Sequence, residues 1–140
     1  MTSVKRVEPH VAELMDPLFG EIRRVFGSED WDGLRPSHFR LLAHVPPGGI
    51  TITELGEELG MTKQGSGQFV AALTESGHLE VRVDPDDRRA RIVVRTKAGD
   101  ATLKAFNNRL LKLEREWAKV VGPERYATFK DVLVELVARF

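Results

Sequence analysis

Apolar residues recur every three or four positions near both ends of the chain, which is the spacing of one face of an α-helix. The first series, within residues 8–26, is Val11, Leu14, Leu18, Ile22 and Val25. The second is Leu103, Phe106, Leu110, Leu113, Trp117 and Val120, and it continues after a Gly-Pro break with Tyr126, Phe129, Leu133, Leu136 and Phe140. These patterns predict one amphipathic helix at the start of the chain and two at its end.

Three shorter helices are predicted in the middle of the chain. The first opens at Pro36 and stops at a PPGG sequence that no helix continues through. Thr51 and Glu54 have the spacing of a capping box at the start of the second helix, and Gly60 suits a left-handed stop at its end. Thr62 then caps the third helix, and Thr96 caps the long helix that begins at about residue 97. Two short helices joined by a tight glycine-containing turn indicate a helix-turn-helix unit.

From residue 79 the apolar period changes from 3.6 to 2, which is the period of a β-strand. Leu79, Val81 and Val83 alternate with polar residues, and after the turn-rich DPDD sequence Ile92 and Val94 alternate with Arg91, Val93 and Arg95. This pattern predicts a β-hairpin with an exposed tip. A hairpin directly after a helix-turn-helix is a wing, so the predicted fold is mainly α with a small β-hairpin wing.

The third short helix, residues 62–77, contains the sequence TKQGSGQFVAAL. Helical phase predicts a core-facing side made of Gly65, Phe69, Ala72, Leu73 and Ser76, and an outer side made of Lys63, Gln64, Gly67, Ala71 and Thr74. The outer side is small and polar, and a major groove admits such a helix, with glutamine pairing to adenine and lysine to guanine or phosphate. The residues expected to contact DNA are Thr62, Lys63, Gln64, Ser66, Gly67 and Gln68. Of the two glycines, Gly65 is expected to allow close packing and Gly67 close approach to the groove.

The chain carries 21 basic and 21 acidic side chains, so any charge signal for nucleic acid has to be local. The hairpin tip supplies one, because Arg88, Arg89 and Arg91 fall within four positions. Arginine gains from the enhanced negative potential of a narrow minor groove, and we expect these three to contact DNA. Asp87 is expected to accept hydrogen bonds from a neighbouring arginine and orient it.

Composition excludes several classes of protein. There is no cysteine, which removes disulfides, zinc–thiolate sites and cysteine-based oxidant sensing. No apolar stretch approaches the roughly 18 residues that a membrane-spanning helix needs, and the charged N-terminus lacks the apolar block of a secretion signal. We therefore expect a cytoplasmic protein without membrane contact. A length of 140 residues suits a single domain, residues 1–140.

Two features resemble chemical sites but lack the necessary context. The Gly65-Ser66-Gly67 run follows no buried strand and has neither phosphate-loop nor dinucleotide-loop spacing, and Ser66 has no histidine in a triad-like pattern. The histidines, which are His10, His38, His44 and His78, show no metal-ligand spacing. We expect no enzymatic activity, no metal and no cofactor.

The segment PSHFRLLAHVPPGGITITELGEELGMTKQGSGQFVAALTESGHLEVRVDPDDRRARIVVRTKAG, residues 36–99, resembles the winged helix-turn-helix of the MarR (multiple antibiotic resistance regulator) family. Its DPDDRRAR wing followed by TKAG is the most specific part. The resemblance implies that residues 36–95 are a DNA-binding lobe, that 62–77 is the recognition helix, and that the protein represses transcription from a palindromic operator. A winged-helix scaffold that binds a protein partner without ligand response is the alternative.

The resemblance also implies a homodimer in which the N- and C-terminal helices, residues 8–26 and 97–140, interlock. A lobe spanning residues 36–95 cannot cover three further amphipathic helices on one chain, which favours the same assembly. The expected interface residues are Val11, Leu14, Leu18, Leu110, Leu113, Trp117, Phe129, Leu133 and Leu136. Many family members release DNA when a small aromatic or phenolic ligand binds between the dimerisation helices and the lobe. Trp31, in a loop beside that crevice, either lines such a pocket or anchors the core.

Overall fold

The computed structural model describes residues 7–27 and 31–140 of the chain. The chain divides into two compact units, residues 1–30 and residues 31–140. The described part of the first unit contains one helix, α1 (Val11–Gly27). Among the described residues, no helix is long and apolar enough to cross a membrane.

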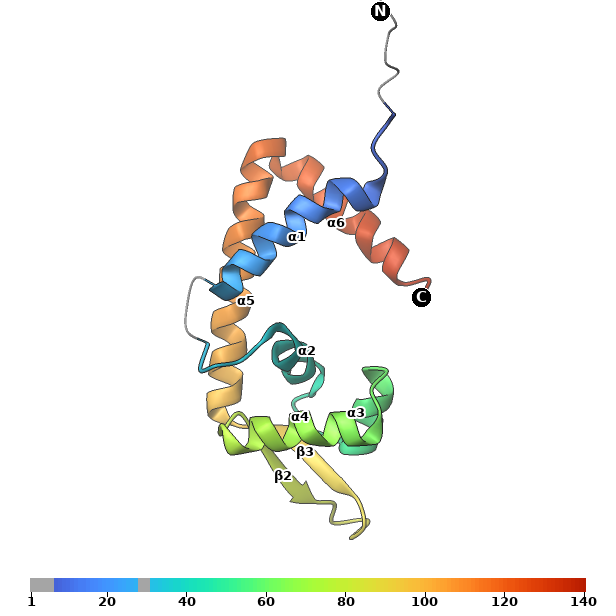
Figure 1. Cartoon of the computed structure of the whole chain (residues 1–140), viewed down its shortest axis with the longest axis vertical. Helices are drawn as coiled ribbons and strands as arrows, with labels where there is room; N and C mark the ends of the chain where they lie inside the picture. The colour runs from blue at the N-terminus through green and yellow to red at the C-terminus, as the bar shows by residue number, and fades with distance from the viewer. Residues whose placement is uncertain (1–6, 28–30) are drawn as a thin grey trace, which may run out of the picture. The chain divides into compact units, whose positions relative to one another are not determined.

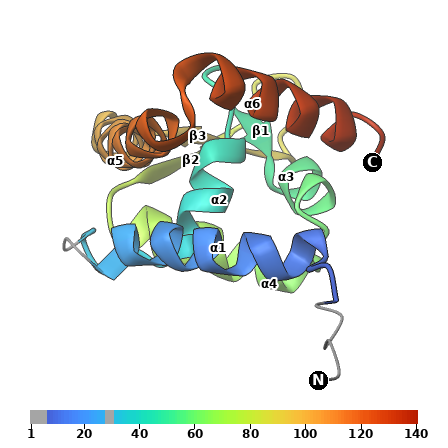
Figure 2. The ribbon, with the colours of Figure 1, turned by 90° about the horizontal axis from the view of Figure 1, so that it is seen from above.

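The second unit contains five helices and a small sheet among its described residues, and they follow the predicted order. They are α2 (Pro36–His44), β1 (Ile50–Thr51), α3 (Ile52–Glu58), α4 (Lys63–Glu75), β2 (Leu79–Val83), β3 (Arg91–Arg95), α5 (Lys97–Val121) and α6 (Pro123–Val137). Figure 1 shows α4 and the β2–β3 hairpin together at one end of this unit, with the α5–α6 connection at the other. Seen from above, α5 is viewed nearly along its axis and α6 runs away from its far end (Figure 2). The predicted fold class is confirmed.

Threonine caps fix the starts of three helices, as their sequences predict. Thr51, Thr62 and Thr96 each accept a hydrogen bond on Oγ1 from the backbone N–H three residues on, at 3.2, 3.0 and 3.1 Å respectively. Each bond satisfies one of the N–H groups that a helix start leaves without an intrahelical partner. The boundaries of α3, α4 and α5 are therefore set locally.

The sheet has the order β1-β3-β2 and is antiparallel throughout. Val93 pairs with Ile50 on one side and Val81 on the other, and it is fully buried, whereas Ile92 and Val94 are only half-buried. The alternation of Ile92 and Val94 therefore does not mark the buried side of β3. Directly paired residues share a face of the sheet, so the buried side of β2 dictates which side of β3 is buried. No sequence pattern predicts β1, because its two residues are too few to alternate.

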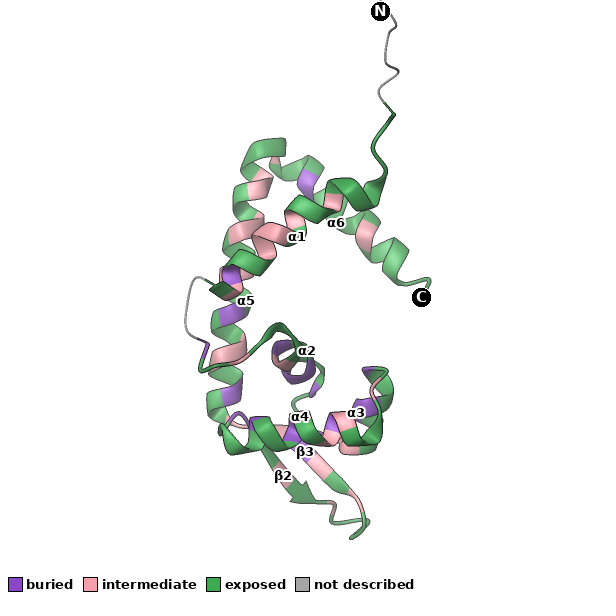
Figure 3. Cartoon of the chain, in the orientation of Figure 1, coloured by how far each residue is buried: buried purple, intermediate pink, exposed green. Residues whose placement is uncertain are grey.

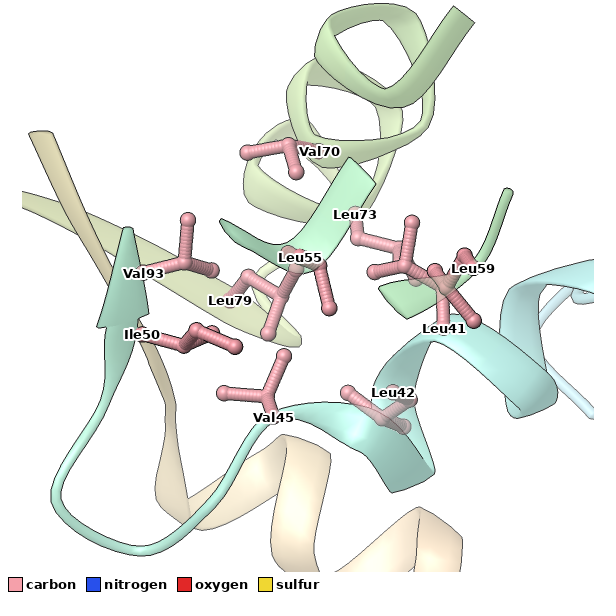
Figure 4. Packing of buried hydrophobic residues seen from close by; sticks show 10 residues of the cluster. All are labelled: Leu41, Leu42, Val45, Ile50, Leu55, Leu59, Val70, Leu73, Leu79 and Val93. Atoms are coloured by element: carbon pink, nitrogen blue, oxygen red, sulfur yellow. The ribbon is translucent and has the colours of Figure 1, made fainter. Parts of the chain in front are cut away.

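The core of the lobe collects one or more side chains from every element of residues 36–95. Figure 4 shows its buried members, which are Leu41, Leu42, Val45, Ile50, Leu55, Leu59, Val70, Leu73, Leu79 and Val93. Since each helix and strand of the lobe contributes to a single cluster, α4 and the hairpin are held in one fixed arrangement.

Helix α4 buries a different set of residues from the predicted one. Its buried side chains are Ser66, Val70 and Leu73, which are spaced four and three apart, while Ala72 and Ser76 are exposed. The predicted inward side was therefore wrong at Ala72 and Ser76. Because α4 has few large apolar residues, its sequence does not determine which side is buried. Packing on the neighbouring helix determines it.

That neighbour is α3, and the two helices meet at Gly56 and Ser66. A Cβ atom on Gly56 would lie 2.9 Å from Ser66 Oγ and 3.3 Å from Ser66 Cβ. A Cβ on Gly65, in contrast, would meet the cap oxygen of Thr62 at 3.0 Å and otherwise only the end of Met61. The glycine that allows close packing of the helix-turn-helix is therefore Gly56, not Gly65 as predicted.

Arg95 joins the end of α2 to the start of α5. Its Nη1 donates to the backbone oxygens of Val45 at 2.6 Å and Leu42 at 3.3 Å, and its Nε pairs with Asp100 Oδ1 at 2.7 Å. The Arg95 side chain is only 17% exposed. It therefore satisfies carbonyl groups that the end of α2 leaves without helical partners, a role that its place in an alternating strand did not predict.

Helices α5 and α6 are held together through Tyr126, the buried residue of α6. Burial and the hydrogen-bonded carboxylate of Glu114 raise the pKa of Tyr126 to about 12. Lys130 pairs with the same carboxylate at 3.1 Å. Beyond Tyr126, most of the apolar side chains of α6 are exposed.

Alanine substitutions at Gly56 and Gly67 should change stability in opposite directions, because Gly56 is crowded by Ser66 and Gly67 has free space around it. Gly56→Ala should lower the free energy of unfolding by about 1–2 kcal/mol, because overpacking against Ser66 exceeds the gain in helix propensity. Gly67→Ala should raise it by up to about 1 kcal/mol, because a Cβ there meets nothing within 4 Å. Chemical denaturation measures both, and removing the crowded hydroxyl with Ser66→Ala should recover part of the Gly56→Ala loss. Equal effects at both glycines would contradict the packing described.

Candidate nucleic-acid interface

The first two turns of α4 present a polar surface to solvent. Lys63, Gln64 and Gln68 are exposed, and so is the capping residue Thr62. Gly67 lies among them, and a Cβ atom there would have nothing within 4 Å. A major groove about 12 Å wide can admit a helix with such a surface, and the N–H groups of its first turn attract phosphate.

Ser66 does not belong to this surface. Its side chain is fully buried, its hydroxyl donates to the backbone oxygen of Lys63 at 3.1 Å, and it faces Gly56 of α3. The prediction that Ser66 contacts DNA is corrected for this reason: the packing of α3 on α4 turns it inward.

The wing tip presents two arginines whose side chains have no partner among the residues that the structure describes. Arg88 and Arg89 are exposed, and in residues 7–27 and 31–140 neither side chain makes a hydrogen bond or an ion pair. Their guanidinium groups are therefore available to phosphate or to a minor groove. Figure 1 places this hairpin beside α4, and the two elements are in contact.

Asp87 organises the wing through the backbone. Its Oδ1 accepts a hydrogen bond from the backbone N–H of Arg89 at 3.0 Å, and its carbonyl accepts one from Ala90 at 3.0 Å. This is a turn in which an aspartate bonds the chain two residues on. The expected bond from an arginine side chain to Asp87 is absent among the described residues, so Asp87 positions Arg89 by fixing its backbone.

Arg91 differs from the other two arginines. Its Nη1 donates to the backbone oxygens of Arg88 at 3.0 Å and Ala90 at 3.4 Å. The side chain is exposed, but its guanidinium already braces the tip of the hairpin. Arg91 therefore shapes the loop that carries Arg88 and Arg89, and any contact of its own with DNA comes in addition.

Trp31 lies in an aromatic cluster with α2 and α5. Its ring meets Phe39 at a centroid distance of 5.7 Å and Phe106 at 5.4 Å, both edge-on, and those two phenylalanines stack at 4.2 Å. Trp31 is 6% exposed. Of the two roles expected for it, these contacts support the core anchor.

A buried histidine that the sequence did not single out connects α4 to the start of α5. His78 is 3% exposed, and its ring contacts Ser76 Oγ at 2.7 Å and Asp32 Oδ2 at 3.4 Å. Its backbone oxygen accepts from Thr96 N–H at 3.1 Å, and Gly99 packs so close to it that a Cβ would clash. No spacing motif marks His78, because Asp32 and Gly99 lie far from it in the sequence.

A second histidine contacts the recognition helix from α2. The ring of His38 lies edge-on to Phe69 at 5.3 Å, and its Nδ1 accepts the backbone N–H of Arg35 at 2.9 Å. Desolvation, followed by the charge of Arg35, lowers the pKa of His38. A neutral ring is the form that can accept this hydrogen bond on Nδ1.

The residues expected at a dimer interface fall into two groups. Val11, Leu14, Phe129 and Leu136 are 68%, 57%, 40% and 54% exposed. The half-buried group is Leu18, Leu110, Leu113, Trp117 and Leu133. Exposed apolar side chains gather on α6, where Val132, Val134 and Val137 are also 47%, 67% and 70% exposed.

Comparison with known sequences gives a regulator family. Residues 32–90 match the sequence profile of the MarR family. The HTH-type transcriptional regulator PetP of Rhodobacter capsulatus is 31% identical over 85 residues, which are 61% of this chain and 51% of PetP. An uncharacterised protein of Mycobacterium tuberculosis is 26% identical over 106 residues, 76% of this chain and 74% of that protein.

Solved structures share the fold over almost the whole chain. The transcriptional regulator Tm0710 from Thermotoga maritima is 26% identical, with a TM-score of 0.66 over 91% of this chain and 88% of Tm0710. A MepR mutant from S. aureus bound to an oligodeoxyribonucleotide has a TM-score of 0.67 at 17% identity, over 94% of this chain and 99% of the MepR chain. The PcaV transcriptional regulator from Streptomyces coelicolor, in complex with its natural ligand, has a TM-score of 0.69 at 19% identity, over 99% of this chain and 98% of the PcaV chain.

Replacing Gly67 with a large side chain should separate folding from DNA binding. Gly67→Leu should leave the free energy of unfolding within about 1 kcal/mol of wild type, since open space surrounds the position. It should abolish duplex binding, because the side chain would hold α4 away from the groove. Denaturation and gel-shift titration measure the two effects, and Gly67→Ala should give an intermediate loss. A Gly67→Leu variant that binds duplex normally would show that this face of α4 lies outside the interface.

Proposed function

We propose, from the premise that residues 32–90 belong to the MarR family of DNA-binding transcriptional regulators, that the chain represses transcription as a homodimer on a palindromic operator. The observation that carries the proposal is the pairing of an open polar face on α4 with two unpartnered arginines on the adjacent wing. Neither feature supplies a nucleophile, a metal or a cofactor, so binding and release are the whole of the proposed activity. The cytoplasm is its proposed site of action.

Reading of the operator is assigned to α4. Gln64 and Gln68 can each pair with adenine through donor and acceptor together, and Lys63 can reach guanine or phosphate. Thr62 and the first-turn N–H groups suit a phosphate contact. The S. aureus MepR mutant, which has the same fold, binds an oligodeoxyribonucleotide, and this supports DNA as the ligand of the corresponding surface here.

Affinity that does not depend on sequence is assigned to the wing. Arg88 and Arg89 place two free positive charges at the tip of the hairpin, and Arg91 and Asp87 hold that tip in shape. Phosphate neutralisation of this kind is strongly salt-dependent. The division of labour is therefore specificity from α4 and general DNA affinity from the wing.

Dimerisation is assigned to the exposed apolar residues of α1 and α6 and to the half-buried residues at the C-terminal end of α5. Covering these side chains with a second copy would remove most of the large apolar surface of the chain from water. Two α4 helices would then read half-sites about one helical turn, 34–36 Å, apart. Linking the two binding events makes modest affinity at each half-site sufficient.

Release by a small aromatic ligand is the proposed control step. PcaV, which shares the fold, was solved with its natural ligand. In this chain the cluster of Trp31, Phe39 and Phe106 ties α2 to α5, so an aromatic ligand that competes for these ring contacts would change how the lobe is held on α5. The competing function, a winged-helix scaffold for a protein partner, predicts no such ligand and no salt-sensitive duplex binding.

Two alanine substitutions should separate base reading from phosphate contact. Gln64→Ala should cost about 1–3 kcal/mol on the selected operator and relax the preference at one base pair, because it removes a bidentate contact. Arg89→Ala should weaken binding to all duplexes and reduce the slope of log K against log salt by about 0.9. Titrations of operator and random duplex over a salt series measure both. Equal loss on both duplexes for Gln64→Ala would reassign it to phosphate, and salt-insensitive binding by the wild type would favour the scaffold.

A charge placed on the exposed end of α6 should break the dimer. Leu136→Glu should raise the dissociation constant of the dimer by more than about tenfold, since burying an unpaired carboxylate costs more than about 1.4 kcal/mol. Val83→Glu is the matched control: Val83 is 53% exposed and Leu136 is 54%, but Val83 lies on the wing. Analytical ultracentrifugation should show dimers for wild type and Val83→Glu. A Leu136→Glu protein that remains equally dimeric would place the interface elsewhere.

A further inference from the structure

Helix α5 has a basic face opposite its apolar one. At 3.6 residues per turn, five exposed cations fall within about 80° of the helix circumference. They are Lys97, Lys104, Lys112, Arg115 and Lys119, here called the α5 basic stripe. The buried and half-buried side chains Leu103, Phe106, Leu110, Leu113 and Trp117 lie on the opposite side of the same helix. Figure 3 shows the resulting mixture of buried and exposed segments along α5.

The stripe has no anionic partner within the described parts of the chain. Asp100 pairs with Arg95 and Glu114 pairs with Lys130, so two acidic residues of α5 are already engaged by cations that lie off the stripe. Glu116 borders the stripe and makes no ion pair among the described residues. In a chain whose charges sum to zero, this is a local excess of free positive charge.

The stripe has the length of a DNA contact but lies outside the proposed operator interface. From Lys97 to Lys119 it extends for about 33 Å at 1.5 Å per residue, close to the roughly 34–36 Å of one duplex turn. Figure 1 shows that α5 leaves the lobe and runs away from α4 and the hairpin. A straight duplex held by α4 therefore cannot also follow the stripe.

We propose that the α5 basic stripe binds a second segment of duplex nucleic acid through its phosphates, so that one dimer can bridge two duplexes. Charge complementarity selects the occupant, because a duplex carries about one negative charge per 1.7 Å of its axis and the stripe is a row of exposed positive charges. The stripe lies on the side of α5 opposite Leu110, Leu113 and Trp117, so an interface built through these apolar residues of α5 does not cover it. This inference goes beyond operator binding and does not require α4 to read sequence.

The expected salt dependence follows from the number of cations. Five phosphate contacts give a slope of log K against log salt of about −4.5, so the affinity of the stripe should fall about 500-fold between about 50 and 200 mM salt. Reversing three of the five charges should leave a slope of at most about −1.8. Second-duplex binding should therefore disappear in the substituted protein at low salt.

The test uses the full chain loaded on an immobilised duplex and offered a second, fluorescent duplex of unrelated sequence. Wild type should capture the fluorescent duplex at low salt and release it as salt rises. The triple variant Lys104→Glu, Lys112→Glu, Arg115→Glu should stay on the immobilised duplex but capture no fluorescent one. Circular dichroism and sedimentation check that the variant remains folded and dimeric, which surface positions of this exposure should allow.

Two controls separate the stripe from charge in general. Lys104→Arg with Lys112→Arg keeps the charge and should keep capture. Arg23→Glu, Arg125→Glu and Arg139→Glu together change the net charge as much as the triple variant, at exposed positions off the stripe, and should also keep capture. Loss of capture in this second control would overturn the proposal in favour of a net-charge effect.

The remaining outcomes also decide. If the triple variant captures as much fluorescent duplex as wild type, the two lobes bridge the duplexes and the stripe proposal is overturned. If wild type holds one duplex but never a second, operator binding stays intact and the stripe proposal is again overturned. Stripe-dependent binding to phosphatidylserine vesicles without duplex capture would overturn it in favour of a membrane surface. If the chain does not hold the immobilised duplex, the operator proposal fails. The stripe is then tested separately by the fluorescence anisotropy of a free duplex, and equal anisotropy with wild type and with the triple variant overturns it.

Discussion

The contact between Gly56 and Ser66 determines how α4 is rotated about its own axis, and the surface offered to DNA follows from that rotation. The absence of a side chain on Gly56 lets α3 approach until Ser66 is fully buried. Val70 and Leu73 then face the core, and Lys63, Gln64 and Gln68 face solvent. Because a turn of about 100° separates consecutive helical residues, rotating α4 by one residue would exchange exposed side chains for buried ones.

A second set of contacts transmits the position of the lobe to α5. Arg95 binds the last carbonyls of α2 and an acidic residue in the first turn of α5, while His78 sits between the end of α4 and the tightly packed Gly99. Both are polar groups with little exposure to water, and such groups are costly to leave unpaired. These contacts therefore hold the end of α2 and the end of α4 against the first turn of α5.

The charges of this protein sum to zero, but they are unevenly distributed over its surface. Twenty-one acids balance twenty-one bases, yet the wing tip and one face of α5 each present cations without acidic partners. Arg91 and Asp87 show how the wing achieves this, since they bond to backbone groups and leave the guanidinium groups of Arg88 and Arg89 free. Free charge at exposed positions acts over about a Debye length, roughly 8–10 Å at physiological salt. These cations are therefore suited to contact phosphate groups and not to stabilise the fold.

The sequence by itself determined the elements and their order, because their signals are local. Apolar periodicity placed the helices, the caps at Thr51, Thr62 and Thr96 placed their starts, and the change of period placed the hairpin. Tertiary structure decided the rotation of α4, the burial of Ser66, the inward face at Val93, the pairing of β1 and the joints at Arg95 and His78. Each of these depends on atoms brought together from distant positions, for example the pairing of Arg95 with carbonyls about fifty residues earlier. A helix with only two large buried side chains can pack in more than one rotation, and only contact with its neighbour selects one.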